Sequence, residues 1–192
     1  MRWVILSQSI AILGSSLVFP FYLIFIKEVG GGFLQYGISY GLFTISSAFI
    51  HVIVGRLSDR MGRKWFLLIN SWGMATLLLF FPIVVHIWQV YILQVLLGAA
   101  GAMQKTSEKA LLGDFTSSSN RGTAIGYYHF WTSIFAGVAV MLGGLIIDLL
   151  TIDIIFYISS FILFLSGFFI LKIKETNHGY SEIQKQGQQL AD

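Results

Sequence analysis

The sequence predicts an all-α polytopic membrane protein that crosses the bilayer with six helices. Hydrophobic residues make up 56 % of the chain, charged residues make up 11 %, and the mean hydropathy is +0.77, whereas soluble domains carry about 25 % charged residues. The charges are also clustered. The segments that lack any charge are 3–26, 29–55, 65–104, 122–147 and 154–171. Because about 20 apolar residues cross a bilayer as a helix, these segments predict the spans.

The first span is expected at residues 3–26, because this run is longer than the apolar core of a signal peptide and no small-residue cleavage site follows it. The second is expected at 33–54. The run 65–104 is too long for one span, so Pro82, His86 and Gln89 are expected to divide it. The remaining spans are predicted at 65–84, 88–111, 122–147 and 153–172.

Together these spans form a predicted six-helix domain over residues 1–174, followed by a polar, Gln-rich tail at 175–192. The tail has too few apolar residues to fold alone and is expected to be disordered. With six spans, the side that carries both termini holds all the Lys and Arg residues except Lys27. The positive-inside rule therefore predicts a multi-pass protein of the cell membrane with both termini in the cytoplasm.

The segment between the second and third spans, residues 55–67, reads Gly-Arg-Leu-Ser-Asp-Arg-Met-Gly-Arg-Lys-Trp-Phe-Leu. It resembles the signature loop of the major facilitator superfamily, Gly-x-Leu-Ala-Asp-Arg-x-Gly-Arg-Lys-x-x-Leu, with only Ser58 in place of Ala. Ala110-Leu-Leu-Gly-Asp114, Arg121-Gly122 and Gly126 also resemble the junction of that family's fourth and fifth helices. The resemblance implies a secondary transporter of a small solute and the N-terminal half of that fold, with its 3+3 inverted repeat.

In the family this loop acts as a conformational latch for the outward-open state. The candidate latch residues are Gly55, Asp59, Arg60, Gly62, Arg63, Lys64, Asp114 and Arg121. The resemblance makes Asp114 the nearest carboxylate for the basic residues, and the two loop glycines are expected to permit a tight turn between helices. Alternatively, the basic residues only set topology, which explains Arg63 and Lys64 but neither Asp59 nor the glycines.

Four spans carry polar or small residues along one face at helical spacing. The stripes are Tyr36, Tyr40, Thr44, Ser47 and His51 in the second span, Gly122, Gly126, His129, Ser133, Gly137 and Gly144 in the fifth, Gln8, Ser15 and Tyr22 in the first, and Gln94, Gly98, Gly101, Lys105 and Glu108 in the fourth. Polar stripes avoid lipid, so spans 1, 2, 4 and 5 are expected inside and spans 3 and 6 at the periphery. The resemblance implies that spans 2 and 5 pack against another half. Simple helix packing is the alternative for the small residues.

The first and fourth spans hold the candidate cavity residues, where substrate binding or proton coupling would occur. They are Gln8, Ser15, Tyr22, Gln94, Lys105 and Glu108. If the fourth helix continues to Leu112, Lys105 lies about 10 Å inside its end and is expected to pair with Glu108 at i+3. Alternatively, the helix ends near Gln104 and both charges are cytoplasmic. The family's fourth-helix Arg is Gln94 in this chain, and Gly143-Gly144 lacks the preceding Gly-Pro, so the sequence does not support drug/proton antiport.

Other function classes fit poorly. The sequence lacks the short motifs of metalloproteases, hydrolases and nucleotide-binding loops, so no enzymatic activity and no cofactor are expected. Without cysteine, and with four scattered histidines, no metal site is expected. The basic residues flank the spans, which argues against nucleic acid as a partner. A non-transporting scaffold or sensor subunit of the same fold remains a second possibility, which a vesicle transport assay would distinguish.

The chain is about half as long as the family's usual transporter. Three arrangements follow: a homodimer, a pairing with a separate C-terminal half, or a truncated fragment. We favour the homodimer, because Met1 directly precedes the first span and a complete polar tail follows the last. In each case the expected surroundings are the lipid bilayer and a small-molecule substrate.

Overall fold

The computed structural model describes residues 2–116 and 120–173, with the backbone alone at residues 59–61, and this part of the chain folds as helices joined by short turns. Six helical runs are long and apolar enough to cross a membrane. The elements in chain order are α1 (Arg2–Val18), η1 (Phe19–Phe21), α2 (Tyr22–Glu28), α3 (Phe33–Met61), α4 (Arg63–Leu79), η2 (Phe81–Ile83), α5 (Ile87–Asp114), α6 (Arg121–Leu149) and α7 (Ile152–Leu171).

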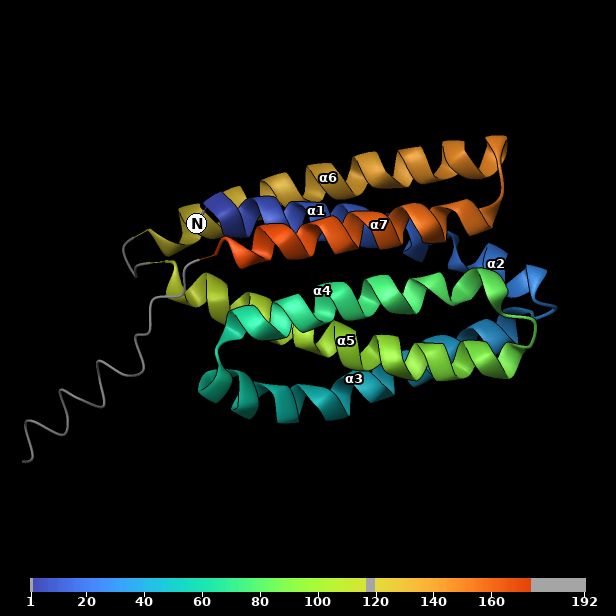
Figure 1. The fold of residues 1–192 in the computed structure, drawn as a ribbon, viewed down its shortest axis with the longest axis horizontal. Coiled ribbons are helices and arrows are strands. Elements are labelled where there is room, and N and C mark those ends of the chain that lie inside the picture. Colours follow the sequence, from blue (N-terminus) through green and yellow to red (C-terminus); the bar gives the residue numbers. More distant parts are fainter. Residues whose placement is uncertain (1, 117–119, 174–192) are drawn as a thin grey trace, which may run out of the picture.

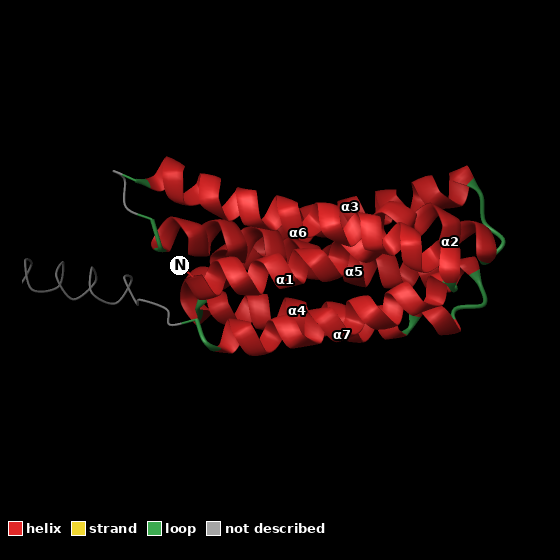
Figure 2. Ribbon diagram, turned by 90° about the horizontal axis from the view of Figure 1, so that it is seen from above, coloured by secondary structure: helices red, strands yellow, loops and turns green. Residues whose placement is uncertain are grey.

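The helices form an open arc. Along it α3 packs on α5, α5 on α4, α4 on α7, α7 on α1, and α1 on α6. In Figure 2 the pair α4 and α7 forms one side, α1 and α5 lie in the middle, and α3 and α6 form the opposite side. Figure 1 shows α3 and α6 at the two edges of the bundle. The arc therefore has two terminal helices, α3 and α6, each with a single close neighbour.

An aromatic cluster holds the end of the bundle away from the N-terminus. Phe25 of α2, Phe81 of η2 and Phe156 of α7 are almost fully buried, and their ring centroids lie 4.9–5.3 Å apart. Rings at this spacing attract each other beyond the burial of their apolar surface. The cluster joins the first, third and sixth spans.

Pro20 interrupts the first span. The sequence predicted a continuous helix over 3–26, but the chain forms a 3₁₀ turn at Phe19–Phe21 between α1 and α2. Proline has no N–H to donate and its ring clashes with the preceding turn. Neighbouring helices accommodate the break, since Gly143 of α6 packs against the ring of Phe21 and the carbonyl of Leu17.

The division of the run 65–104 is confirmed. Pro82 lies in η2, and α5 begins after His86. The Gln89 side-chain oxygen accepts hydrogen bonds of 3.0 Å from the backbone N–H groups of Val85 and His86. These bonds satisfy backbone donors at the start of α5.

Within one chain the third and sixth spans are more buried than the second and fifth, and the expectation that spans 3 and 6 lie at the periphery once another half packs on spans 2 and 5 stays a prediction. Half of the third span's most apolar segment is buried and 44 % of the sixth's, against 17 % in the second and fifth spans. Small residues on α7 explain the result, because Gly167 packs on Trp72 and the Ser160 hydroxyl donates to the carbonyl of Ala75 over 2.6 Å. The periodicity identified polar stripes but could not show which faces have a neighbour.

Candidate functional site

A chain of polar side chains crosses the bundle and joins four spans. We name these residues the polar centre: Gln8 of α1, Asn70 of α4, Gln104 and Glu108 of α5, and Tyr128 of α6. Gln104 is the hub, because its amide nitrogen donates to the Gln8 side-chain oxygen and, over 3.4 Å, to Glu108. Its oxygen accepts a 2.6 Å hydrogen bond from Asn70. The Tyr128 hydroxyl donates to the other Glu108 oxygen over 2.6 Å.

The polar centre is largely buried. Gln8 and Tyr128 are fully buried and Asn70 is 2 % exposed, while Gln104 and Glu108 are half-buried. Two of its atoms, Gln8 Nε2 and Asn70 Oδ1, have no hydrogen-bond partner in the described part of the chain. One is a donor and the other an acceptor, so the centre has unused capacity for a polar group of each kind.

The expected pair between Lys105 and Glu108 does not form. α5 continues to Asp114, so the alternative in which it ends near Gln104 is wrong, and Lys105 lies about 14 Å from the end of the helix. Lys105 is nevertheless exposed, whereas Glu108 is held by Gln104 and Tyr128. Tyr128 and Gln104 provide donors from fixed positions, which a flexible lysine side chain on the exposed face does not.

The other candidate cavity residues lie apart from the polar centre. The Ser15 hydroxyl donates to the carbonyls of Ala11 and Ile12 in its own helix, each over 3.1 Å. Tyr22 and Gln94 are buried near the opposite end of the bundle. The Tyr22 ring packs against Phe25 and other aromatic rings. The structure therefore brings Gln8 together with Glu108 and separates them from Ser15, Tyr22 and Gln94.

The signature segment forms the turn between α3 and α4 at a single residue. Gly62 has φ +92°, a left-handed conformation that favours glycine. Arg63, the next residue, forms an ion pair with Asp114 and donates a 2.6 Å hydrogen bond to the Ala110 carbonyl. Lys64 donates to the carbonyls of Leu171 and Ile173 over 2.6 and 2.8 Å.

These two basic residues therefore bind near the C-terminal ends of two helices. The last carbonyls of a helix have no intrahelical partner, and its C-terminus carries partial negative charge. Lys64 binds such a carbonyl at the end of α7, whereas Arg63 binds the side chain of Asp114, the last residue of α5, and the Ala110 carbonyl one turn before it. Topology alone explains their charge, but the structure adds specific partners on two helices.

The remaining latch candidates are placed differently. α3 continues through Met61, so the predicted end of this span at residue 54 is wrong and most of the signature segment is helical. Gly55 lies inside α3 rather than at the turn, and a Cβ there would meet no neighbouring atom. Asp59 and Arg60 lie in the last turn of α3, and their side chains are outside the described residues. Arg121 begins α6 and is exposed.

The polar stripe of the second span packs against α5 at one end and is exposed at the other. His51 Nδ1 lies 2.7 Å from the Thr106 hydroxyl of α5, and its Nε2 lies 3.2 Å from the Ser47 hydroxyl. Thr44 and Tyr40 are exposed, and the Tyr40 ring stacks on Tyr36 at 6.3 Å. The half of the stripe near His51 therefore packs within the chain.

Most of the stripe of the fifth span lies on an open surface. Gly122, Gly126, His129, Ser133 and Gly137 are all exposed. A Cβ at any of these three glycines would meet no neighbouring atom within 4 Å in the described chain. Gly144 differs, because a Cβ there would lie 3.6 Å from the Phe21 ring.

Sequence reasoning missed three members of the polar centre as site residues, Asn70, Gln104 and Tyr128. Gln104 lies four residues before Glu108, a spacing that places both on one helix face, and this was the available signal. The sequence gives no signal for Tyr128. Tyr127 is the same residue type at the next position, and only the rotation of the helix decides that Tyr128 is buried and Tyr127 exposed.

Comparison with known proteins adds independent evidence. The sequence profile of the Major Facilitator Superfamily matches residues 4–191. The chain is 54 % identical over 158 residues to the protein named "Uncharacterized MFS-type transporter YitZ" of Bacillus subtilis (strain 168), a match that covers 82 % of this chain and 96 % of that protein.

Longer relatives share the same region. "Multidrug resistance protein MdtG" of Proteus mirabilis (strain HI4320) is 28 % identical over 177 residues, covering 90 % of this chain and 43 % of that protein. The MdtG protein of Dickeya zeae (strain Ech586) is 30 % identical over 165 residues, covering 82 % and 40 %. The chain thus spans less than half the length of these two relatives. The six helical spans, the signature segment and the profile match agree that this chain belongs to the Major Facilitator Superfamily.

Proposed function

We propose that this chain is a half-size secondary transporter of a small solute, which works as a homodimer by alternating access. Membership of the Major Facilitator Superfamily supports the transport activity. The polar centre carries the proposal, because it places a half-buried carboxylate, Glu108, in a hydrogen-bonded network in which Tyr128 of another span binds it directly and Gln104 links it to Gln8. Ionisable groups within a membrane protein are expensive to retain and usually mark a substrate or ion pathway.

Glu108 is the proposed coupling residue. As a carboxylate it accepts hydrogen bonds from Gln104 and Tyr128, whereas a protonated carboxyl would itself become a donor. Protonation of Glu108 would therefore weaken the link between α5 and α6. The test is the pH dependence of solute uptake in proteoliposomes for Glu108→Gln, with Glu28→Gln as a matched control. An unchanged pH profile in Glu108→Gln would remove Glu108 from the mechanism.

The homodimer would complete the fold through the two terminal helices of the arc. Only 17 % of the most apolar segment of α3 and of α6 is buried, and each presents exposed small and polar residues, such as Thr44 and Ser133. A membrane-facing stripe of this kind favours another helix over lipid. Most oligomers are symmetric dimers, so a second copy is the simplest partner.

Cysteine cross-linking tests the dimer directly, because the natural chain contains no cysteine. The single variants Ser133→Cys and Thr44→Cys are each expected to give disulfide-linked dimers in proteoliposomes. Phe164→Cys, at an exposed position of α7, is the control and should not cross-link. Native mass spectrometry in lipid nanodiscs would give the stoichiometry independently. A monomer in both assays would favour a separate C-terminal half or the non-transporting subunit.

We propose that the turn at Gly62 acts as the latch. It lies on the side that we assign to the cytoplasm from the distribution of Lys and Arg. Arg63 and Lys64 tie the start of α4 to the ends of α5 and α7. We expect Asp59→Asn to alter the transport rate without preventing folding. Wild-type kinetics in this variant would argue against the latch.

A further inference from the structure

Two aromatic rings hold a lysine at the end of the bundle that carries the N-terminus. Lys172 directly follows α7, and its Nζ lies 5.0 Å from the centre of the Trp3 ring of α1 and 5.6 Å from that of the Phe169 ring. The two rings stack with their centroids 6.4 Å apart. An ammonium over an aromatic face is attracted by the quadrupole of the ring. Because Lys172 and Trp3 are exposed, this contact fixes the position of a charge that stays accessible from outside the bundle.

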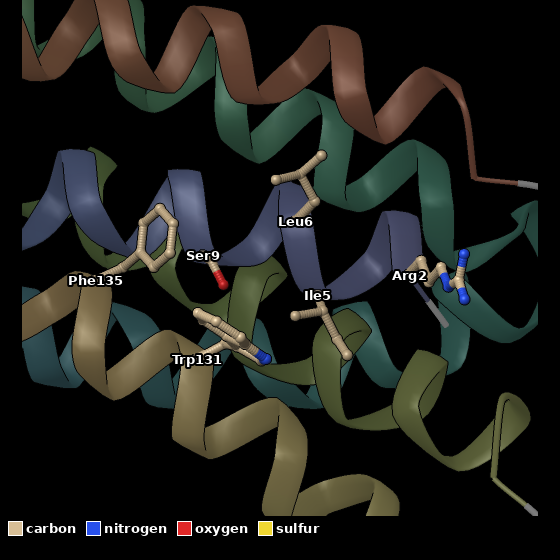
Figure 3. A pocket seen from close by; sticks show the side chains of 6 residues that line it. All are labelled: Arg2, Ile5, Leu6, Ser9, Trp131 and Phe135. Carbon is tan, nitrogen blue, oxygen red and sulfur yellow. The ribbon is translucent and has the colours of Figure 1, made fainter.

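Arg2 places a second cation beside this contact. It precedes Trp3 in α1 and is exposed. Figure 3, which views the neighbouring pocket between α1 and α6, shows Arg2 at the start of α1 with its guanidinium directed away from Trp131 and Phe135. No carboxylate of the described residues forms an ion pair with Arg2 or Lys172. Both cations are therefore available to an anion from outside the chain.

Lys64 adds positive charge to the same end of α7. Its Nζ donates hydrogen bonds to the carbonyls of Leu171 and Ile173, the residues on either side of Lys172. The start of α4 is thereby held against the end of α7. Basic residues from α1 and α4 therefore lie close to Lys172, at one corner of the bundle.

This corner lies at the depth of the lipid headgroups. The first span begins at Arg2 and the sixth ends at Leu171, so the corner is where both helices leave the bilayer. Aromatic rings gather at this level in membrane proteins. Apolar side chains continue from the corner along the outer surface, with Leu6 exposed on α1 and Phe168 exposed on α7. The surface thus offers cations at headgroup level and apolar contacts below them.

We propose that this corner binds the headgroup of an anionic phospholipid. The site, which we name the Lys172 site, consists of Arg2, Trp3, Phe169 and Lys172. Its guanidinium and ammonium groups would donate charge-assisted hydrogen bonds to the phosphate oxygens, and the acyl chains would lie on the apolar surface of α1 and α7. The cytoplasmic leaflet, to which we assign this end, carries anionic lipids. A zwitterionic lipid also has a phosphate, but the two cations would repel its ammonium group.

The opposite end of the bundle provides a contrast within the same chain. There Lys27 lies over the Phe33 ring, with its Nζ 5.3 Å from the ring centre. Glu28 follows Lys27 directly, and Glu28 and Asp153 line one cavity of about 490 Å³. These carboxylates would repel an anionic headgroup. A lysine over an aromatic ring therefore does not suffice, and the surplus of cations distinguishes the Lys172 site.

The test is titration of the purified full chain in detergent with phosphatidylglycerol and, separately, with phosphatidylcholine, in which native mass spectrometry counts the bound lipids. We expect the first phosphatidylglycerol to bind at least about fivefold more tightly than the first phosphatidylcholine, because each basic residue near a headgroup contributes about this factor. Binding requires no transport, so the result is independent of the proposed transport function.

Substitutions in the Lys172 site should reduce this preference. Arg2→Gln and Lys172→Gln should each weaken phosphatidylglycerol binding by about fivefold. Trp3→Ala should weaken it by about two- to fivefold, because the Lys172 ammonium loses a ring that holds it. Lys172→Arg should retain the preference, since arginine keeps the charge and also stacks on aromatic faces. The thermal unfolding temperature in the same detergent checks that each variant is folded.

Two basic residues elsewhere serve as controls. Lys109→Gln removes an exposed cation from α5 at the same end of the bundle, and Lys27→Gln removes the lysine over Phe33 at the other end. Both should leave phosphatidylglycerol binding unchanged. An equal loss in Lys109→Gln would show that diffuse positive charge attracts the lipid, and this would overturn the Lys172 site.

Two further results would contradict the proposal. The first is equal affinity for the two lipids, or unchanged phosphatidylglycerol binding in folded Lys172→Gln. The second is displacement of bound phosphatidylglycerol by glycerol 1-phosphate at the same concentration. This competitor carries a phosphate but no acyl chain, so displacement would identify a site for soluble phosphates instead of a lipid site.

Discussion

The Tyr128 hydroxyl donates a 2.6 Å hydrogen bond to the carboxylate of Glu108, and through it α6 is joined to α5 although the two helices do not pack along each other. α6 otherwise rests mainly on α1. This bond therefore connects α6, one terminal helix of the arc, to α5. A substitution or protonation of Glu108 would alter the contact with α6 directly.

Removal of the Tyr128 hydroxyl should loosen this link. Tyr128→Phe preserves the buried ring but leaves Glu108 with the 3.4 Å contact from Gln104 as its hydrogen bond within the polar centre. We expect a loss of about 1 kcal/mol in the free energy of unfolding, measured by denaturation in mixed micelles. Tyr127→Phe is the matched control because Tyr127 is 63 % exposed, and an equal loss there would contradict the assignment.

Gln104 should matter more than any one of its partners. Gln104→Leu would leave Asn70 Nδ2 and Gln8 Oε1 without this partner inside the bundle, and buried polar groups without partners are destabilising. We expect a loss of about 2 kcal/mol in the free energy of unfolding. Lys105→Leu, at the next and exposed position, should change it far less. Similar losses in the two variants would show that Gln104 is not the hub.

Gly98 should tolerate no side chain. A Cβ at this position would collide with the backbone carbonyl of Phe43, which cannot move without shifting α3. We expect Gly98→Ala to destabilise the fold by about 1–3 kcal/mol, despite the higher helix propensity of alanine. Gly113→Ala is the control in the same helix, because a Cβ there meets no neighbouring atom. Thermal unfolding of both variants decides the matter, and an intact Gly98→Ala protein would refute the close packing of α3 on α5.

The Arg63–Asp114 pair should show measurable coupling. Both side chains are partly exposed, at 26 % and 33 %, so a double-mutant cycle of Arg63→Gln and Asp114→Asn should give about 0.5–1 kcal/mol. Arg63→Gln alone should destabilise more than Asp114→Asn, because the Ala110 carbonyl also loses its donor. Arg56→Gln, at an exposed position of α3, is the control. A coupling of zero would leave the Ala110 carbonyl as the partner through which Arg63 stabilises the fold.

Several features could be predicted from the sequence because they depend on local chemistry. Charge-free segments identified six spans, since no charged residue is cheaply placed in lipid. Pro82 and Gln89 marked a helix boundary, and Gly62 marked the turn between α3 and α4, because each acts on its own backbone. The signature residues also indicated the family, because they lie in one continuous segment whose spacing is visible in the sequence.

Tertiary structure alone decided which faces meet. The same periodicity that placed Lys105 and Glu108 on one face of α5 could not show that Tyr128, on another helix, would take the carboxylate. Nor could it show that Ser160 and Gly167 would bury α7 while Ser133 and Gly137 on α6 remain exposed. A sequence records the chemistry of each helix face, but the partner of that face depends on helix rotation and crossing, which only the packed bundle sets.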